Sequence, residues 1–470
     1  MKEPSADLAD WSATDLVSAY SRREVSPVET TRAVLARIEA ADREVNAYCL
    51  VDADSALAQA RASEARWAGG SPQGVVDGVP ASVKDLFLTR GWPTLRGSKA
   101  IDPDQPWEEE APAVARLRES GAVLVGKTTT PELGWKGVTD SPLTGITRNP
   151  WDTTRTAGGS SGGAGAAVAL GMAPLAVGTD GGGSVRIPGS FCGVVALKPT
   201  YGRIPHYPAS PYGTLAHAGP MTSTVDDTAL MLDVLSGFDS RDWSAMPPPA
   251  LSYAESLGAG VRDLSVAFSA TLGYVDVDPE VAALVKEAVE VLGGLGARVE
   301  EVDPGFTDPV ESFHVLWFSG AAQTIRNYTP EQRDALEPSL RSVCELGTRF
   351  SALDYLQATQ ERMDLGLRMG AFHERHDLLV TPTMPMVAFE AGREVPPGWP
   401  TDRWSSWAPF SYPFNMTQQP AATVPCGFTS AGLPVGLQIV GPRHSDHRVL
   451  AAAKAFQDAT TWCGRRPPLR

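Results

Sequence analysis

The sequence predicts an α/β fold in one large domain, with a central mixed β-sheet flanked by helices. From residue 75 onward, short apolar runs alternate with glycine-containing turns and helical stretches, a pattern typical of a mixed α/β core. The 470 residues contain no internal repeat, Ser/Gly linker or charge block that would mark a domain boundary. We therefore expect residues 1–470 to form a single domain.

The first element is a helical arm, predicted for residues 1–70, that lies on the rest of the protein. The motif SPVE at 26–29 has the pattern of a capping box with proline at the first helical position. It predicts a helix that runs to about Ala41. A second helix is predicted over residues 54–67, where a Gly-Gly pair stops it.

The core elements follow along the chain. Apolar runs of strand length occupy residues 80–83, 122–126, 174–178, 194–197, 264–269, 298–302, 378–381, 421–424 and 435–440. Helices are predicted at 111–120, 278–295 and 448–459, and the second of these is long and amphipathic. Residues 305–415 are expected to form a surface excursion from this core.

Charge and composition argue against several classes of function. The formal net charge is −15 and no Lys/Arg run stands out, so the surface should repel phosphate backbones and we expect no nucleic-acid partner. The N-terminus lacks the apolar region of a signal peptide, and the apolar stretch 163–177 is too short and interrupted to span a bilayer. We expect a cytoplasmic protein outside the membrane, and five scattered cysteines fit that reducing compartment.

Two serines stand in glycine-rich loops between residues 156 and 188. Ser160 lies in GGSSGG and Ser184 in DGGGSVR. The three glycines before Ser184 would leave several backbone N–H groups pointing at one spot, as an oxyanion hole requires. The spacing therefore predicts a nucleophilic serine beside donors that stabilise a tetrahedral intermediate.

A serine hydroxyl is a poor nucleophile until a base takes its proton. Lys84, in GVPASVKD, comes at the end of an apolar strand, which is an unusual place for a surface charge. Burial disfavours the ammonium form and leaves a neutral amine that can act as a base. An isolated lysine of this kind is more often solvated, but the two serine loops favour the catalytic interpretation.

In these motifs the sequence resembles the amidase signature family. The Lys84 strand, the GGSSGG loop and the GTDGGGSVRIP loop match the family's motif in order and spacing. Looser matches extend the resemblance over roughly residues 10–460: GKTTTPELG at 126–134, NPWD at 149–152, TPTMP at 381–385 and PVGLQIVGP at 434–442.

The resemblance implies a role for each matching residue. Ser184 would attack the carbonyl and become acylated. Ser160, at the position that the family holds with a cis peptide, would relay the proton between Ser184 and Lys84. Lys84 would be the general base and then the general acid for the leaving amine. The oxyanion hole would be formed by the N–H groups of Gly181, Gly182, Gly183 and Ser184, and the loops would be supported by Asp180, Arg186 and Ser161. Water would then release the acyl group, with no metal and no organic cofactor.

Other motif matches carry less weight. Residues 158–162 fit the G-x-S-x-G elbow, which would make Ser160 the nucleophile with a histidine partner. Residues 121–128 fit the Walker pattern, but their middle resembles a buried strand. Residues 163–168 lack the last small residue of a dinucleotide fingerprint. His373 and His376 are three residues apart, whereas H-E-x-x-H zinc sites need four.

The sequence indicates less about the substrate than about the catalytic motifs. In this family the variable segments build the pocket, and here these are 135–146, 306–328 and 389–412, largely within the region 305–415. Aromatic residues that could favour an apolar or aryl substrate are Trp135, Trp399, Trp404, Trp407 and Phe410. The alternative is that these tryptophans only attach their loops to the core. We expect an amidase for hydrophobic or aryl amides that also cleaves esters and, by extension, carbamates (urethanes).

Two other roles within the family stay open. The A-type subunits of tRNA-dependent amidotransferases hydrolyse glutamine, and they should carry an acidic residue at Ala408 and a glycine at Gln418. Both departures argue against a glutamine substrate. A non-catalytic binding subunit is the other alternative, although Lys84, Ser160 and Ser184 are all present. The partner is expected to be a small-molecule amide, ester or carbamate, and the chain a monomer or homodimer.

Overall fold

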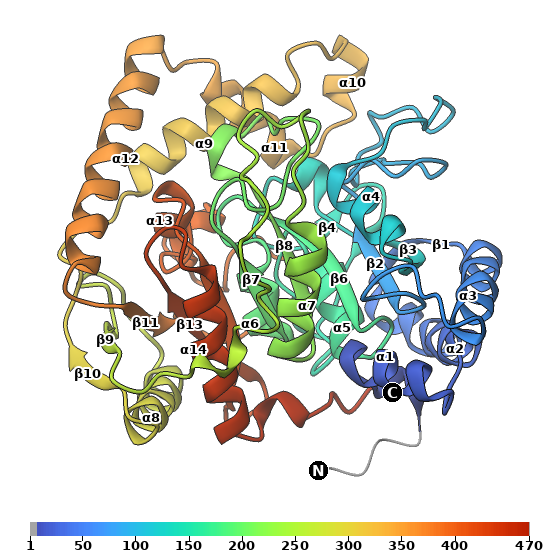
Figure 1. The fold of residues 1–470 in the computed structure, drawn as a ribbon. Coiled ribbons are helices and arrows are strands. Elements are labelled where there is room, and N and C mark those ends of the chain that lie inside the picture. Colours follow the sequence, from blue (N-terminus) through green and yellow to red (C-terminus); the bar gives the residue numbers. More distant parts are fainter. Residues whose placement is uncertain (1–6, 470) are drawn as a thin grey trace.

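The computed structural model describes residues 7–469, which form an eleven-stranded mixed sheet with helices on both faces (Figure 1). The strand order is β1-β3-β2-β6-β8-β7-β12-β13-β11-β9-β10. Their bounds, in that order, are Tyr48–Val51, Val123–Thr128, Pro80–Lys84, Leu175–Asp180, His217–Thr222, Val195–Lys198, Ala421–Phe428, Pro434–Val440, Leu378–Pro382, Ser265–Phe268 and Arg298–Glu301. This confirms the predicted α/β class with a central mixed sheet.

Each predicted strand is present, and the sheet gains two that were not predicted. β8 has the sequence HAGPMT, and a proline normally argues against a central strand. Nevertheless Pro220 stands opposite Val177 in the antiparallel pairing of β8 with β6. The other addition, β1, forms the edge beside β3. A short separate hairpin joins β4 (Asp140–Ser141) to β5 (Gly145–Ile146).

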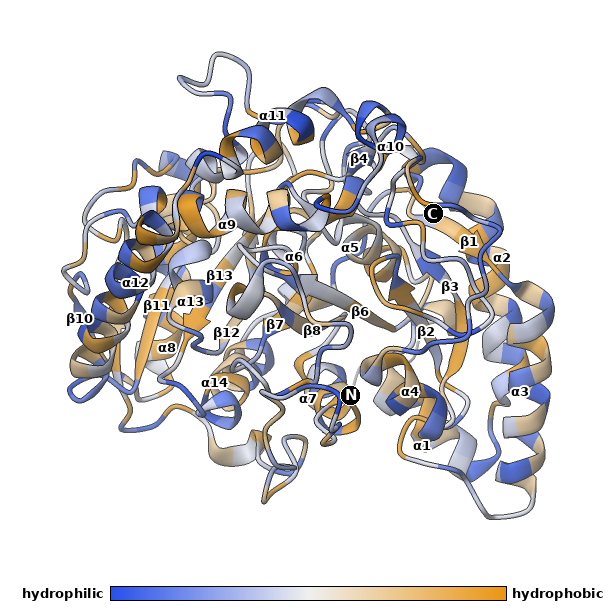
Figure 2. Ribbon diagram, turned by 90° about the horizontal axis from the view of Figure 1, so that it is seen from above, coloured by the Kyte–Doolittle hydropathy of each residue, from blue (hydrophilic) through white to orange (hydrophobic). Residues whose placement is uncertain are grey.

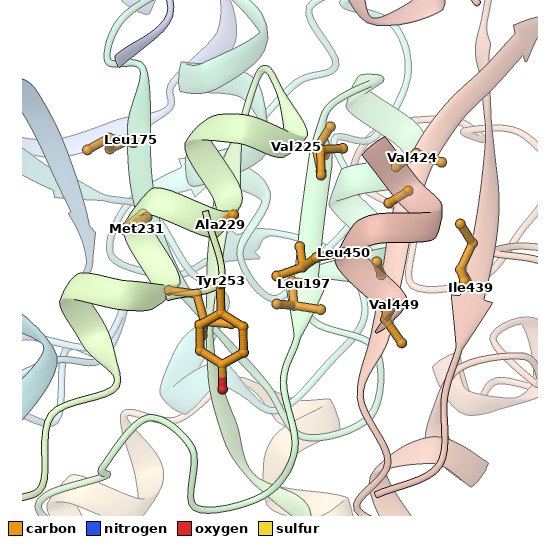
Figure 3. Packing of buried hydrophobic residues seen from close by; sticks show 14 of the residues in the cluster. Leu175, Leu197, Val225, Ala229, Met231, Tyr253, Val424, Ile439, Val449 and Leu450 are labelled. Carbon is orange, nitrogen blue, oxygen red and sulfur yellow. The ribbon is translucent and has the colours of Figure 1, made fainter. Parts of the chain in front are cut away.

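One face of the sheet is covered by helices that share a single apolar core. They are α1 (Ala13–Arg22), α4 (Pro112–Glu119), α7 (Val225–Leu235), α8 (Pro279–Gly294) and α14 (Asp446–Ala459). Figure 3 shows side chains of α7 and α14, such as Val225 and Leu450, beside strand residues Leu197 and Ile439. Burial of these aliphatic side chains holds the helices on the sheet, at about 25 cal/mol per Å² of apolar surface.

The other face carries the helices that hold the site. α5 (Gly162–Ala169) and α6 (Arg186–Cys192) lie directly on the strands, and α2 (Pro27–Val45) packs beside α5. Figure 2 shows α5, α6 and α9 on the opposite side of the sheet from α7 and α14. α2 has the predicted capping box and continues past the predicted end at Ala41, and α3 (Ala53–Ala68) packs against it. Residues 1–6 of the predicted arm lie outside the described residues.

Residues 305–415 are largely helical. They contain α9 (Val310–Thr324), α10 (Pro330–Asp334), α11 (Pro338–Gly347), α12 (Ala352–His373) and α13 (Tyr412–Met416). Figure 1 shows α9–α12, in yellow and orange, along the top and one side of the molecule. β11 interrupts this region and runs inside the sheet between β13 and β9, so the excursion returns to the core midway.

Candidate active site

The site forms where two parallel strands end at the same edge of the sheet. β2 and β6 are parallel neighbours; β2 ends at Lys84 and β6 ends with Thr179 and Asp180. α5 begins at Gly162, so Ser160 and Ser161 lie directly before its first turn. The topology therefore brings together the three segments on which the sequence motifs stand.

Lys84 is fully buried at the centre of this cluster. Its Nζ lies 2.7 Å from Ser160 Oγ, 2.8 Å from Ser161 Oγ and 2.9 Å from Thr179 Oγ1. Burial lowers the pKa of the Lys84 amine well below its usual value, and the nearby Asp180 carboxylate only partly opposes this shift. The lowered pKa favours the neutral amine, which is the form that can accept a proton.

The surrounding hydrogen bonds orient this amine. Ser161 Oγ donates to the Thr179 carbonyl at 3.1 Å, so its proton is committed and it accepts from Lys84. A neutral amine has two N–H donors and one lone pair. When Ser161 Oγ and Thr179 Oγ1 accept the two N–H groups, the lone pair faces Ser160 Oγ, the nearest hydroxyl at 2.7 Å. Thr179, which the sequence motifs did not single out, completes the cluster.

The loop that carries Ser184 is locked onto the Ser160 loop. The Ser161 N–H donates to the Ser184 carbonyl at 3.0 Å, and the Gly159–Ser160 peptide bond is cis. Ser160 and Ser184 are both almost buried and line the same cavity. Within residues 7–469 no direct hydrogen bond joins the two hydroxyls.

Asp180 and Arg186 form the buried ion pair that supports this loop. The Asp180 carboxylate accepts hydrogen bonds from the Arg186 guanidinium at 3.0 Å and from Asn415 Nδ2 at 2.8 Å. Burial by itself would raise the pKa of Asp180, but Arg186, Lys198 and Asn415 hold it well below its usual value. Arg186 also donates to Asn415 Oδ1, and to the Ser411 carbonyl and Gln438 Oε1.

The loop formed by residues 181–183 differs from the expected oxyanion hole at one residue, Gly183. The Gly183 N–H donates to Asp180 Oδ1 at 2.7 Å, so it points into the support of the loop and not toward a substrate. In the described part of the chain the N–H groups of Gly181, Gly182 and Ser184 have no hydrogen-bond partner. These three groups, without Gly183, are the available donors.

Close packing explains why this loop requires glycine. A Cβ at Gly181 would stand 2.7 Å from the Trp317 ring, and one at Gly182 would stand 2.8 Å from Trp404 and 2.9 Å from Phe313. Gly183 has a φ of 122°, which L side chains rarely adopt. Aromatic side chains from the region 305–415 therefore press directly against the loop that carries the nucleophile candidate.

The cavity beside Ser160 and Ser184 has a volume of about 110 Å³. Its aromatic wall comes from Tyr212 and Trp317, whose rings stack with centroids 3.9 Å apart and an interplanar angle of 21°. Trp317 lies in the segment 306–328, one of the three that were expected to build the pocket. The segment 206–212, before β8, forms another wall and was not expected.

The aromatic residues expected to contact substrate do not line this cavity. Trp407 and Phe410 are completely buried in the core, and Trp135 and Trp404 are nearly so. Trp404 packs against Trp317 with ring centroids 5.8 Å apart and forms a layer behind it. Trp399 is partly buried, and its indole N–H donates to Ser406 Oγ. The structure thus places most of these tryptophans where they attach the 389–412 segment to the core.

The competing motif interpretations fail on geometry. The Walker-like lysine, Lys127, is buried in β3 and pairs with Asp85 at 2.8 Å, with no loop that could cradle phosphate. Ser160, in the elbow motif, has Lys84 as its partner instead of a histidine.

Within residues 7–469, no helix is both long and apolar enough to cross a bilayer.

Comparison with known proteins agrees with this geometry. The family model described as Amidase matches residues 29–450. Acylamidase from Rhodococcus erythropolis is 38% identical over 464 residues, covering 97% of each chain. The A-type subunit of glutamyl-tRNA(Gln) amidotransferase from Geobacter sp. (strain M21) is 34% identical over 490 residues, covering 98% of this chain and 100% of that protein.

Solved structures give the same assignment. A bacterial aryl acylamidase of the amidase signature family superposes with a TM-score of 0.90 at 31% identity, covering 97% of both chains. 6-Aminohexanoate cyclic dimer hydrolase, solved with substrate, superposes with a TM-score of 0.89 at 30% identity, covering 99% of this chain and 100% of that one. The chain therefore belongs to the amidase signature family and is an amidase.

Proposed function

We propose that this amidase hydrolyses hydrophobic or aryl amides through an acyl-enzyme, with Ser184 as nucleophile, Ser160 as proton relay and Lys84 as base. The observation that carries the proposal is the fully buried Lys84 amine, which lies 2.7 Å from Ser160 Oγ. Ser160 in turn lines the same cavity as Ser184. A neutral buried amine can take the Ser160 proton as Ser160 takes that of Ser184.

The chemical steps follow from this arrangement. Ser184 Oγ bonds to the substrate carbonyl carbon, and its proton passes through Ser160 to Lys84. The N–H groups of Gly181, Gly182 and Ser184 then stabilise the negative oxygen of the tetrahedral intermediate. The C–N bond breaks as the proton returns along the same path to the leaving amine. Water attacks the acyl-enzyme by the same relay and releases the acid.

The cavity walls support the substrate class. The Tyr212–Trp317 stack offers a flat apolar wall next to Ser184, and Phe87 and Leu133 add further apolar surface. Flat apolar walls favour aryl or other hydrophobic groups over small hydrophilic amides. The aryl acylamidase and the Rhodococcus acylamidase among the relatives agree with this choice. Esters and carbamates present the same carbonyl to the same nucleophile and are proposed as further substrates.

Two positions and the lining of the cavity distinguish this chain from the glutamine-hydrolysing relatives. At the position where those proteins are expected to hold an acidic residue, Ala408 is completely buried in the apolar core. Gln418 adopts a φ of 63°, the left-handed conformation that favours the glycine expected there. No acidic side chain lines the described cavity to grip an amino group.

The test is release of 4-nitroaniline from 4-nitroacetanilide by wild type, Ser184→Ala and Ser71→Ala. Ser71 is exposed and does not line the cavity, so its variant controls for the loss of a hydroxyl. We expect wild type and Ser71→Ala to turn over equally, and Ser184→Ala to be inactive. Activity that survives in Ser184→Ala would remove the proposed nucleophile. 4-Nitrophenyl acetate and an aryl carbamate tested in parallel decide the ester and carbamate activities.

A further inference from the structure

We propose that Arg96 is a specificity residue that binds a carboxylate on the substrate, so that the preferred amides carry an acidic group beside their apolar body. The proposal rests on the amidase function above and narrows its substrate class. Arg96 lines the cavity that contains Ser160 and Ser184. A guanidinium at this position presents several N–H donors in a fork that matches a carboxylate.

Arg96 is the single full positive charge on the cavity wall, and nothing on that wall balances it. The described lining residues are otherwise apolar, hydroxyl-bearing or glycine, apart from His206, and none is acidic. The Asp85 carboxylate accepts the backbone N–H of Arg96 and forms its ion pair with Lys127, and among residues 7–469 no carboxylate pairs with the Arg96 guanidinium.

The positive charge of Arg96 affects the pKa values of two neighbouring side chains, His206 and Tyr328. Burial lowers the pKa of the His206 imidazole, Asp242 raises it, and the Arg96 guanidinium lowers it again. Burial raises the pKa of Tyr328, shortly after α9, and Arg96 opposes that shift. His206 is therefore neutral in the cavity, and Arg96 supplies the positive potential there.

Backbone contacts place Arg96 near the reacting groups. Its carbonyl accepts the Leu133 N–H at 2.8 Å, and Leu133 itself lines the cavity. The next residue, Gly134, approaches the relay: a Cβ built on it would stand 3.7 Å from Ser160 Oγ. The backbone of Arg96 is thus joined to the wall that holds Ser160, and Arg96, Ser160 and Ser184 line one cavity that a single substrate would occupy.

An unpaired guanidinium in a partly enclosed site keeps its charge, because arginine does not deprotonate in proteins. It therefore needs water or a ligand as its partner. A carboxylate replaces that water with two charge-assisted hydrogen bonds, whereas a neutral carboxamide of the same shape makes weaker ones. We expect selectivity for the acid over its carboxamide isostere of about tenfold to a hundredfold.

The experiment compares kcat/KM for pairs of isosteric amides. One pair has the group on the leaving side, 4-acetamidobenzoate against 4-acetamidobenzamide, and the other has it on the acyl side, N-phenylsuccinamic acid against its carboxamide. The variants are Arg96→Met, Arg96→Lys and Lys99→Met. Lys99 is an exposed lysine three residues away that does not line the cavity, so its variant controls for loss of a nearby positive charge.

In wild type and Lys99→Met, one pair should show the preference for the acid. Arg96→Met should lose that preference by tenfold or more while it retains turnover of the neutral isostere, and Arg96→Lys should retain part of it. Retained neutral turnover also shows that the variant is folded. An acid-to-carboxamide ratio that does not change in Arg96→Met, or no preference for either acid in wild type, would overturn the proposal.

A second measurement separates this proposal from the proposed function. If wild type hydrolyses none of these anilides, the proposed reaction fails, and calorimetric titration of Ser184→Ala with 4-acetamidobenzoate and N-phenylsuccinamic acid still tests Arg96. Binding of an acid that falls at least tenfold in Ser184→Ala/Arg96→Met supports the carboxylate site. Equal binding in the two variants, or no binding in either, contradicts it.

Discussion

Lys84 Nζ and Ser160 Oγ lie 2.7 Å apart in the interior of the protein, although 76 positions separate the two residues in the sequence. The lysine is at the end of a strand and the serine is in the loop before a helix. Their contact exists because β2 and β6 run parallel and end at one edge of the sheet. The predictions below test what this relationship and its supports do.

Replacing Lys84 with Met should lower kcat/KM by about 10²–10⁴-fold, the usual range for loss of a general base. The reason is that no other described side chain on the Ser160 side of the cluster can take the proton; Ser161 and Thr179 are hydroxyls. Steady-state kinetics on 4-nitroacetanilide measure the effect. Lys286→Met, on the exposed face of α8, is the matched control and should keep full activity.

The pH dependence follows from the lowered pKa of Lys84. Activity requires the neutral amine, so kcat/KM should rise as pH increases through that pKa and then level off. Stability changes in the same direction: between the lowered folded pKa of Lys84 and 10.5 the unfolded chain binds a proton that the folded chain does not, so this group makes the free energy of unfolding increase with pH across that window. Burial lowers the pKa of Lys198 in the same direction, so the contribution of Lys84 is the difference in slope between wild type and Lys84→Met, measured by urea denaturation across this window. If Lys84→Met kept the same slope, the lowered pKa would be disproved.

Asp180→Asn should destabilise the protein by about 3–5 kcal/mol, because it leaves the fully buried Arg186 guanidinium without its counter-charge. The wild-type contribution is present above the ordinary carboxyl pKa of 3.8 and is lost as pH falls toward the lowered folded value. Chemical denaturation at pH 7 and at pH 3 checks both statements. Glu390→Gln breaks an exposed ion pair with Arg393 and should cost less than about 1 kcal/mol.

Gly182→Ala should reduce kcat by about 10²–10³-fold, the effect of losing one oxyanion-hole donor. The added methyl would meet the rings of Trp404 and Phe313 at under 3 Å, so the loop must move away from its position before Ser184. Gly366→Ala is the control, since its Cβ would meet nothing within 4 Å on α12. A fully active Gly182→Ala enzyme would show that the loop position is not required.

Trp317→Leu should lower kcat/KM for anilides more than for acetamide, because it removes the ring that stacks on Tyr212 in the cavity wall. The ratio of the two activities measures pocket shape and is insensitive to the amount of folded protein. Trp243→Leu, at an 84% exposed position, should leave the ratio unchanged. Equal losses on both substrates would contradict an aryl-binding role for Trp317.

Much of the site could be predicted from local sequence, and the exceptions have one cause. Lys84, Ser160 and Ser184 stand in dense motifs that favour a catalytic interpretation when taken together, and the resemblance to the family adds the Asp180–Arg186 pair. The pocket wall could not be found in this way. Trp317 lies in the predicted pocket segment 306–328, but no local pattern singled it out there, and Tyr212 comes from a segment that was not predicted. The tryptophans that stand out in the sequence serve mainly as core.

The sequence by itself determined the α/β class and the motifs on which the candidate side chains Lys84, Ser160 and Ser184 stand, because periodicity, turn residues and glycine density act over a few neighbouring positions. Tertiary structure alone decided which N–H groups remain free, since the bond from Gly183 to Asp180 depends on how the loop folds back on its strand. It also decided the place of the proline-containing β8 and the exposure of Arg96 to the cavity. Packing and charge compensation between segments distant in the sequence set these features, and no local pattern records them.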